Sequence, residues 1–86
     1  MTDLYGHYHG RILGLARVSG SGVAWRPKLR EILAEFDADC RRLPAPERYA
    51  LRHELASQIE HEALQFADPE RRAVLTLALK HFDAGE

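Results

Sequence analysis

Five histidines stand among the 86 residues, and histidine is the commonest protein metal ligand. His7 and His9 could converge on one ion only in an extended segment, because two positions apart on a helix are about 200° apart around its axis. His53 and His61 match neither the H-E-x-x-H motif nor the E-x-x-H repeat of di-metal bundles. We therefore predict solvated histidines, no metal site and no cofactor.

Covalent chemistry would need an activated nucleophile beside a base. The single cysteine, Cys40, falls on the same helical stripe as Phe36 and Leu43, which predicts a buried, unreactive thiol. Ser19 and Ser21 stand outside the G-x-S-x-G pattern of a nucleophile elbow. The sequence thus predicts no catalytic residues and a protein that is not an enzyme.

Charge is divided unevenly along the chain. Residues 1–30 hold five basic residues and one acidic residue, whereas residues 31–86 hold seven basic and twelve acidic residues. Glu31, Glu35 and Asp39 follow one another four residues apart, so a helix would align them in a row. That row suits a solvated face, or an acidic strip that docks a basic partner. We expect the basic N-terminal part to lie against the acidic helices of its own fold.

Arginines and aromatic residues alternate in the N-terminal segment, and Tyr, Trp and Arg dominate the energetics of protein interfaces. The predicted partner-binding residues are Tyr5, Tyr8, Arg11, Arg17, Trp25, Arg26 and Arg30, together with the acidic row Glu31, Glu35 and Asp39. The same combination of cations and rings suits single-stranded nucleic acid. A pI near 6.5 is far from the basic footprint of nucleic-acid binders, so a protein partner is the first prediction and nucleic acid the alternative.

Most of these residues must be positioned by helices. From Pro27 onward apolar residues recur at helical spacing, which predicts helices near 27–43, 46–66 and 69–83. A proline stands in the first turn of each, where its missing N–H costs nothing, and Asp68 is placed to cap the last helix.

The last of these helices is apolar nearly all round. Residues 73–79 read AVLTLAL, with Thr76 as the one polar position. Such a helix must be buried on most sides, either at the centre of the fold or under a second copy or a partner. Leu75, Leu77 and Leu79 are the residues through which a homodimer would form.

The sequence allows two secondary structures for the first segment. A helix over 3–18 would place Gly6, Gly10 and Gly14 on a bare strip, and each glycine costs about 1 kcal/mol relative to alanine. We expect another backbone to approach that strip closely. The alternative is a β-hairpin with its turn at 19–22. Scarce β-branched residues favour the helix.

Composition limits the architecture and the setting. With 45% hydrophobic and 29% charged residues the chain is typical of a globular protein, and 86 residues predict one domain. We divide this domain, residues 1–86, into an N-terminal segment 1–26 and a helical core 27–86. A lone cysteine and the lack of a roughly 20-residue apolar run predict a cytoplasmic protein without a membrane segment.

These features together predict an all-α fold, a small bundle of three to four helices. The alternative is an α+β fold in which an N-terminal hairpin packs on three helices. The predicted function is that of a small non-enzymatic regulator, adaptor or inhibitor that acts by protein–protein interaction.

Overall fold

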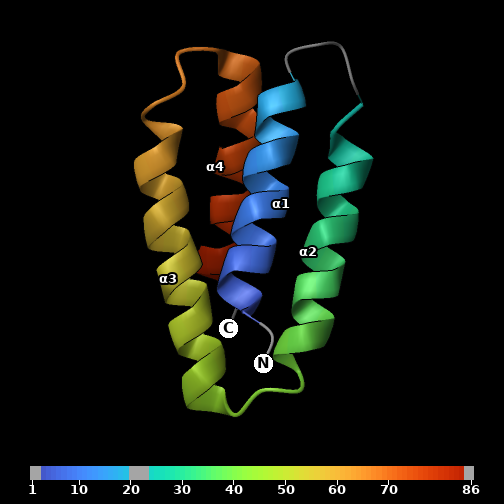
Figure 1. Ribbon diagram of the computed structural model, residues 1–86, viewed down its shortest axis with the longest axis vertical. Helices are drawn as coiled ribbons and strands as arrows, with labels where there is room; N and C mark the ends of the chain where they lie inside the picture. The colour runs from blue at the N-terminus through green and yellow to red at the C-terminus, as the bar shows by residue number, and fades with distance from the viewer. Residues whose placement is uncertain (1–2, 20–23, 85–86) are drawn as a thin grey trace.

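The computed structural model describes residues 3–19 and 24–84 and contains four helices (Figure 1). These are α1 (Leu4–Ser19), α2 (Arg26–Cys40), α3 (Ala45–Ala63) and α4 (Pro69–Ala84). The predicted all-α bundle is confirmed, and no strand occurs within the described ranges. The hairpin alternative is wrong for the first segment, which is helical; residues 20–22 of its turn lie outside the described residues.

The helices form a bundle in which α1 lies in front of α4, with α2 and α3 on opposite sides (Figure 1). Both α1 and α4 pack against the three other helices. Because α4 is enclosed in this way, most of its wide apolar surface is buried without a second copy. Val74, Leu75 and Ala78 are fully buried, and Thr76 is exposed.

Local signals set the helix starts. Asp3 caps α1, since its carboxylate accepts a hydrogen bond from the backbone N–H of Gly6 at 3.2 Å. Asp68 does the same for α4 through the N–H of Glu70, also at 3.2 Å, as predicted. No helix among the described residues combines the length and apolar character needed to cross a membrane.

Two helix ends fall three residues short of their predicted positions. After Cys40, residues 41–43 continue as a tight turn in which Leu43 N–H donates to the Cys40 carbonyl at 3.0 Å. Pro44 explains this end, because proline disfavours helical geometry at the residue before it. After Ala63 the chain turns likewise, and the Arg72 guanidinium donates to the Phe66 carbonyl at 2.6 and 3.0 Å.

The core is built around Phe36, whose side chain has no exposed surface. The rings of Tyr8 and Phe82 meet it edge to face, with centroids 5.3 and 4.8 Å away. Tyr8, Ile12 and Ala16 bring one face of α1 into the same core. The N-terminal segment is therefore an integral helix of the bundle rather than an addition to a three-helix core.

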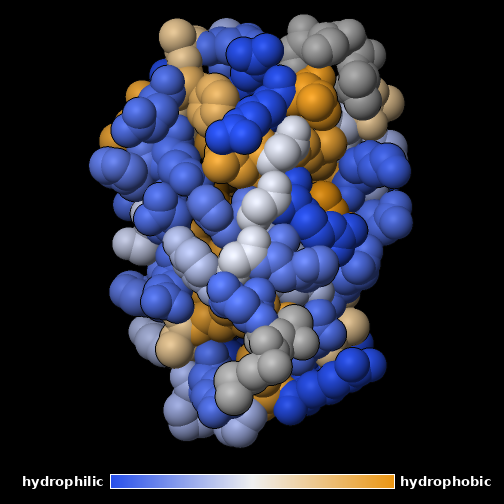
Figure 2. Space-filling view, in the orientation of Figure 1, coloured by the Kyte–Doolittle hydropathy of each residue, from blue (hydrophilic) through white to orange (hydrophobic). Residues whose placement is uncertain are grey.

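The glycines of α1 do not serve the close contact expected of them. A Cβ atom added at Gly10 or Gly14 would meet no atom within 4 Å, and both residues are exposed. The face on which α1 lies is largely hydrophilic, with hydrophobic atoms showing in patches between polar residues (Figure 2). The buried face of α1 thus holds the helix despite its glycines.

Candidate functional site

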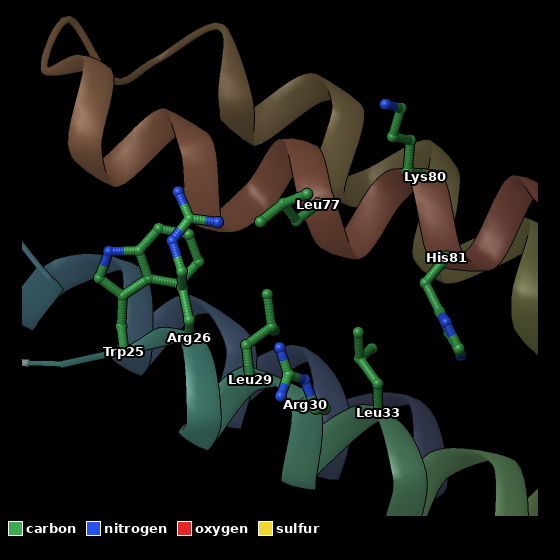
Figure 3. Close-up of a pocket in the computed structure, with 8 residues that line it drawn as sticks. All are labelled: Trp25, Arg26, Leu29, Arg30, Leu33, Leu77, Lys80 and His81. Atoms are coloured by element: carbon green, nitrogen blue, oxygen red, sulfur yellow. The ribbon is translucent and has the colours of Figure 1, made fainter.

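An open groove of about 540 Å³ lies between α2 and α4. Its apolar lining is Trp25, Leu29 and Leu33 from the α2 side and Leu77 from α4. In Figure 3, Leu29 and Leu33 point from α2 toward Leu77 on α4, and Trp25 stands at one end. Leu33 and Leu77 are half-buried, so the bundle leaves part of this lining open to solvent.

The spacing along α2 explains how its side of the groove arises. Leu29 and Ile32 belong to the stripe that faces the core, and both are buried. Leu33 follows Ile32 directly and therefore lies about 100° further round the helix, at the edge of that stripe. Arg26 and Arg30, four residues apart, occupy the next row outward and form the rim on this side.

The rim of the groove is cationic. Arg26 and Arg30 line it from α2 and Lys80 from α4, and all three side chains are exposed. Across the described part of the chain, none of them has a carboxylate oxygen within 4.0 Å. The Arg26 guanidinium carbon lies 4.7 Å from the centre of the Trp25 ring, a cation–π arrangement (Figure 3).

Two carboxylates, those of Glu70 and Asp37, form hydrogen bonds with residues that line the groove. Trp25 Nε1–H donates to the Glu70 carboxylate at 3.1 Å. His81 Nε2 lies 3.0 Å from Asp37 Oδ1, which is also 3.6 Å from an Arg52 nitrogen. These contacts fix the positions of Trp25 and His81 at the two ends of the groove. The residues along its sides remain positively charged.

Two of the three members of the predicted acidic row bond to residues of α1, although Glu35 stays exposed to solvent. Arg11 donates to both oxygens of Glu35, at 2.9 and 3.1 Å, and this pairing keeps the pKa of Glu35 below its usual value. Asp39 accepts a hydrogen bond from the Tyr8 hydroxyl, whose pKa is raised by burial and by that bond. Glu31 is exposed. The basic segment thus meets the acidic helix at these pairs.

The predicted aromatic contacts lie mainly inside the fold. Tyr8 is 1% exposed and Trp25 is 4% exposed, although Trp25 also lines the groove. Tyr5 is half-buried, and its ring is stacked on His9 at 5.6 Å. Arg17 is exposed and lies apart from the groove-lining residues.

The leucines predicted for self-association are separated by the structure. Leu75 is fully buried, so no partner reaches it. Leu77 lines the groove, and Leu79 packs half-buried against the core. A continuous surface of all three does not exist.

Two histidines, His9 and His81, lie beside carboxylates, whereas His7, His53 and His61 are exposed. His9 Nε2 lies 2.8 and 2.9 Å from the two carboxylate oxygens of Glu62. Within the ranges 3–19 and 24–84, no group of three or more His, Cys, Asp or Glu side chains is close enough to hold a metal ion.

Sequence reasoning singled out Trp25, Arg26 and Arg30 but missed the groove itself. Leu33, Lys80 and His81 were not among the predicted contacts. One sequence feature could have indicated the groove. Ile32 and Leu33 are adjacent apolar residues, and they widen the apolar stripe of α2 on one side. Which helix lies beside that wider edge depends on the packing.

Burial of Cys40 raises the pKa of its thiol. We predict that iodoacetamide at neutral pH alkylates the native protein at least about a hundredfold more slowly than the protein in denaturing urea, because reaction requires the core to open. Mass spectrometry of timed samples measures both rates. Equal rates would show that the Cys40 thiol is accessible in the folded chain.

Comparison with known proteins finds no protein-family model, curated protein or solved structure that matches the chain. The function is therefore argued from the groove and its charges.

Proposed function

We propose that the protein is a small non-enzymatic regulator, adaptor or inhibitor that acts by binding part of another protein in the groove between α2 and α4. The observation that supports this proposal is a half-open apolar lining beneath cations that have no carboxylate partner among the described residues. Interfaces combine an apolar centre with a polar rim in this way. The cytoplasmic setting stays a prediction.

Apolar burial and the rim arginines would both contribute to binding. Covering the exposed parts of Leu33 and Leu77 removes apolar surface from water at about 25 cal/mol per Å². Arginines on the exposed rim contribute less to affinity than a buried anchor does, and they act mainly on the association rate and on the choice of partner. Arg26 is already ordered by its contact with Trp25, which lowers the entropy lost when it binds.

A second copy is a poor occupant of this groove. A symmetric dimer would place the same surface of both subunits face to face, so the cations Arg26, Arg30 and Lys80 of one subunit would lie in the same interface as those of the other. Repulsion between like charges across such an interface opposes association. We therefore propose a different protein as the partner and expect this chain alone to be a monomer.

Light scattering on a size-exclusion column tests the monomer. We predict a mass near 9.8 kDa up to millimolar concentration. A dimer of wild-type chain that is lost on Leu77→Glu substitution would show instead that a second copy fills the groove.

The nucleic-acid alternative has less support from the geometry. Base stacking needs exposed rings, whereas Tyr8 and Trp25 are buried and Tyr5 is stacked on His9. Arg11, one of the cations proposed to meet phosphates, is paired with Glu35.

The proposal predicts that groove substitutions abolish capture of the partner. Tagged wild-type protein, a variant with Leu33→Glu and Leu77→Glu, and a control with Val18→Glu and Leu64→Glu are incubated with extract of the source cells. The control residues are 46% and 78% exposed and do not line the groove. Mass spectrometry then compares the recovered proteins.

We expect a protein recovered by wild type and control and lost, by at least about tenfold, from the groove variant. Circular dichroism checks that both variants stay helical. The proposal is contradicted if the groove variant recovers this protein as well as wild type does. It is also contradicted if wild type enriches no protein relative to the groove variant.

A further inference from the structure

We infer that the occupant of the groove is an acidic amphipathic helix of the partner protein. This inference rests on the proposed function, because it names the chemistry of the segment that the groove would bind. Three observations carry it: the shape of the groove, the helical character of its walls, and the distribution of charge around it.

The groove has the length of two helical turns. Its α2 wall runs from Trp25 to Leu33, eight residues along the helix, or about 12 Å. A partner helix with apolar residues at i, i+3 or i+4, and i+7 spans about 10.5 Å over the same stretch. Its side chains would lie between Leu29 and Leu33 on one wall and Leu77 on the other, as ridges pack into grooves between helices.

An extended segment fits these walls less well. A strand needs backbone partners for its N–H and C=O groups, and beyond the first turn of α2 the N–H groups of α2 and α4 along the groove bond within their own helices. A helix satisfies its own backbone and presents only side chains. The groove therefore favours a helical ligand.

Charge selects an acidic ligand. The cations Arg26 and Arg30 stand on α2 along one side of the groove, and Lys80 stands on the outer edge of α4, with its side chain directed away from α2 (Figure 3). Glutamates or aspartates on both flanks of a partner's apolar stripe would meet them, and arginine can hold a carboxylate through two parallel hydrogen bonds. A basic helix would face three cations and be repelled.

The two flanks of α2 differ in how their charges are used. On the flank toward α1, Glu35 and Asp39 are bonded to Arg11 and Tyr8. On the flank toward α4, Arg26 and Arg30 have no carboxylate partner within the described chain. The positive charges beside the groove thus form no ion pair with the described part of the bundle and are available for binding.

Designed peptides test the inference with the full-length protein. The acidic peptide is a capped, side-chain-cross-linked helix of four turns with leucines along one stripe, glutamates on both flanks of it, and no aromatic residue. Its matched control has lysine at every glutamate position. Calorimetry gives the dissociation constants, and the fluorescence of Trp25, the only tryptophan, reports contact at the groove because Arg26 lies over its ring.

We expect the acidic peptide to bind with a dissociation constant of about tens of micromolar and to change the fluorescence of Trp25. The lysine peptide should bind at least about tenfold more weakly. In a variant with Arg26→Glu and Arg30→Glu this preference should reverse. A control with Lys28→Glu and Arg41→Glu makes the same change in net charge at exposed residues outside the groove, and should change the affinity less than about threefold.

The inference is overturned if both peptides bind equally, if neither binds, or if the control variant weakens the acidic peptide as much as the groove variant does. Oleate that changes the fluorescence of Trp25 when the acidic peptide does not would overturn it in favour of a lipid-like ligand. These failures are separate from failure of the proposed function, which is decided by partner recovery with the leucine variants. If the leucine variants lose the partner and the peptides do not bind, the protein still binds a partner in the groove. The bound segment of that partner is then not an acidic helix.

Discussion

Replacing Phe36 with alanine is expected to lower the free energy of unfolding by about 3–5 kcal/mol. Phe36 is fully buried, and it joins the rings of Tyr8 on α1 and Phe82 on α4. The substitution would open a cavity where three helices meet and remove two aromatic contacts at once. Small domains have only about 5–15 kcal/mol in total, so the variant should be close to unfolding at 25 °C.

Urea denaturation followed by circular dichroism measures this loss, and the melting temperature should fall by more than about 12 °C. Tyr49→Ala is the matched control, because this aromatic side chain is 68% exposed and its removal should cost less than about 0.5 kcal/mol. A loss below about 1 kcal/mol for Phe36→Ala would mean that this ring is not at the centre of the core.

Alanine at both Gly10 and Gly14 is expected to stabilise the protein by about 1–2 kcal/mol. Glycine in a helix interior is less favourable than alanine by about 0.5–1 kcal/mol, mainly because it has more freedom in the unfolded chain. A Cβ at either position would meet no atom within 4 Å, so no clash offsets the gain. The melting temperature should rise by about 4–16 °C.

Gly6→Ala is the contrasting variant. Its Cβ would lie 2.8 Å from Asp3 Oδ2, so the carboxylate that caps α1 would have to shift and the gain should be smaller or absent. Thermal unfolding of the single and double variants measures the difference. Destabilisation by Gly10→Ala or Gly14→Ala would show that something packs against these positions in the folded protein.

The fold could be predicted largely from helical spacing and from prolines. Pro27, Pro46 and Pro69 stand near the starts of three helices, and Asp68 caps the last. The apolar run of α4 could not be interpreted from sequence alone, because burial at the centre and burial under a partner require the same composition. Packing of α4 on three helices buries most of this run and leaves Leu77 half-buried at the groove.

The candidate site was less predictable, for a physical reason. Tyr8 was expected at the surface because of its residue type, but it shares a helix face with Ile12 and Ala16 and is buried with them. Spacing within a helix identifies the face that is apolar, whereas a groove depends on how far two helices stand apart. Leu33 on α2 and Leu77 on α4 are far apart in sequence, and only the packed bundle brings them to one groove.

Backbone amide chemical shifts measured by NMR during titration with the acidic peptide test the groove most directly. We predict that the largest changes occur at residues 25–33 of α2 and 77–81 of α4, which form its two walls. Changes centred on the exposed glycines of α1, or on Tyr49 in α3, would contradict the account and place the binding surface on another face of the bundle.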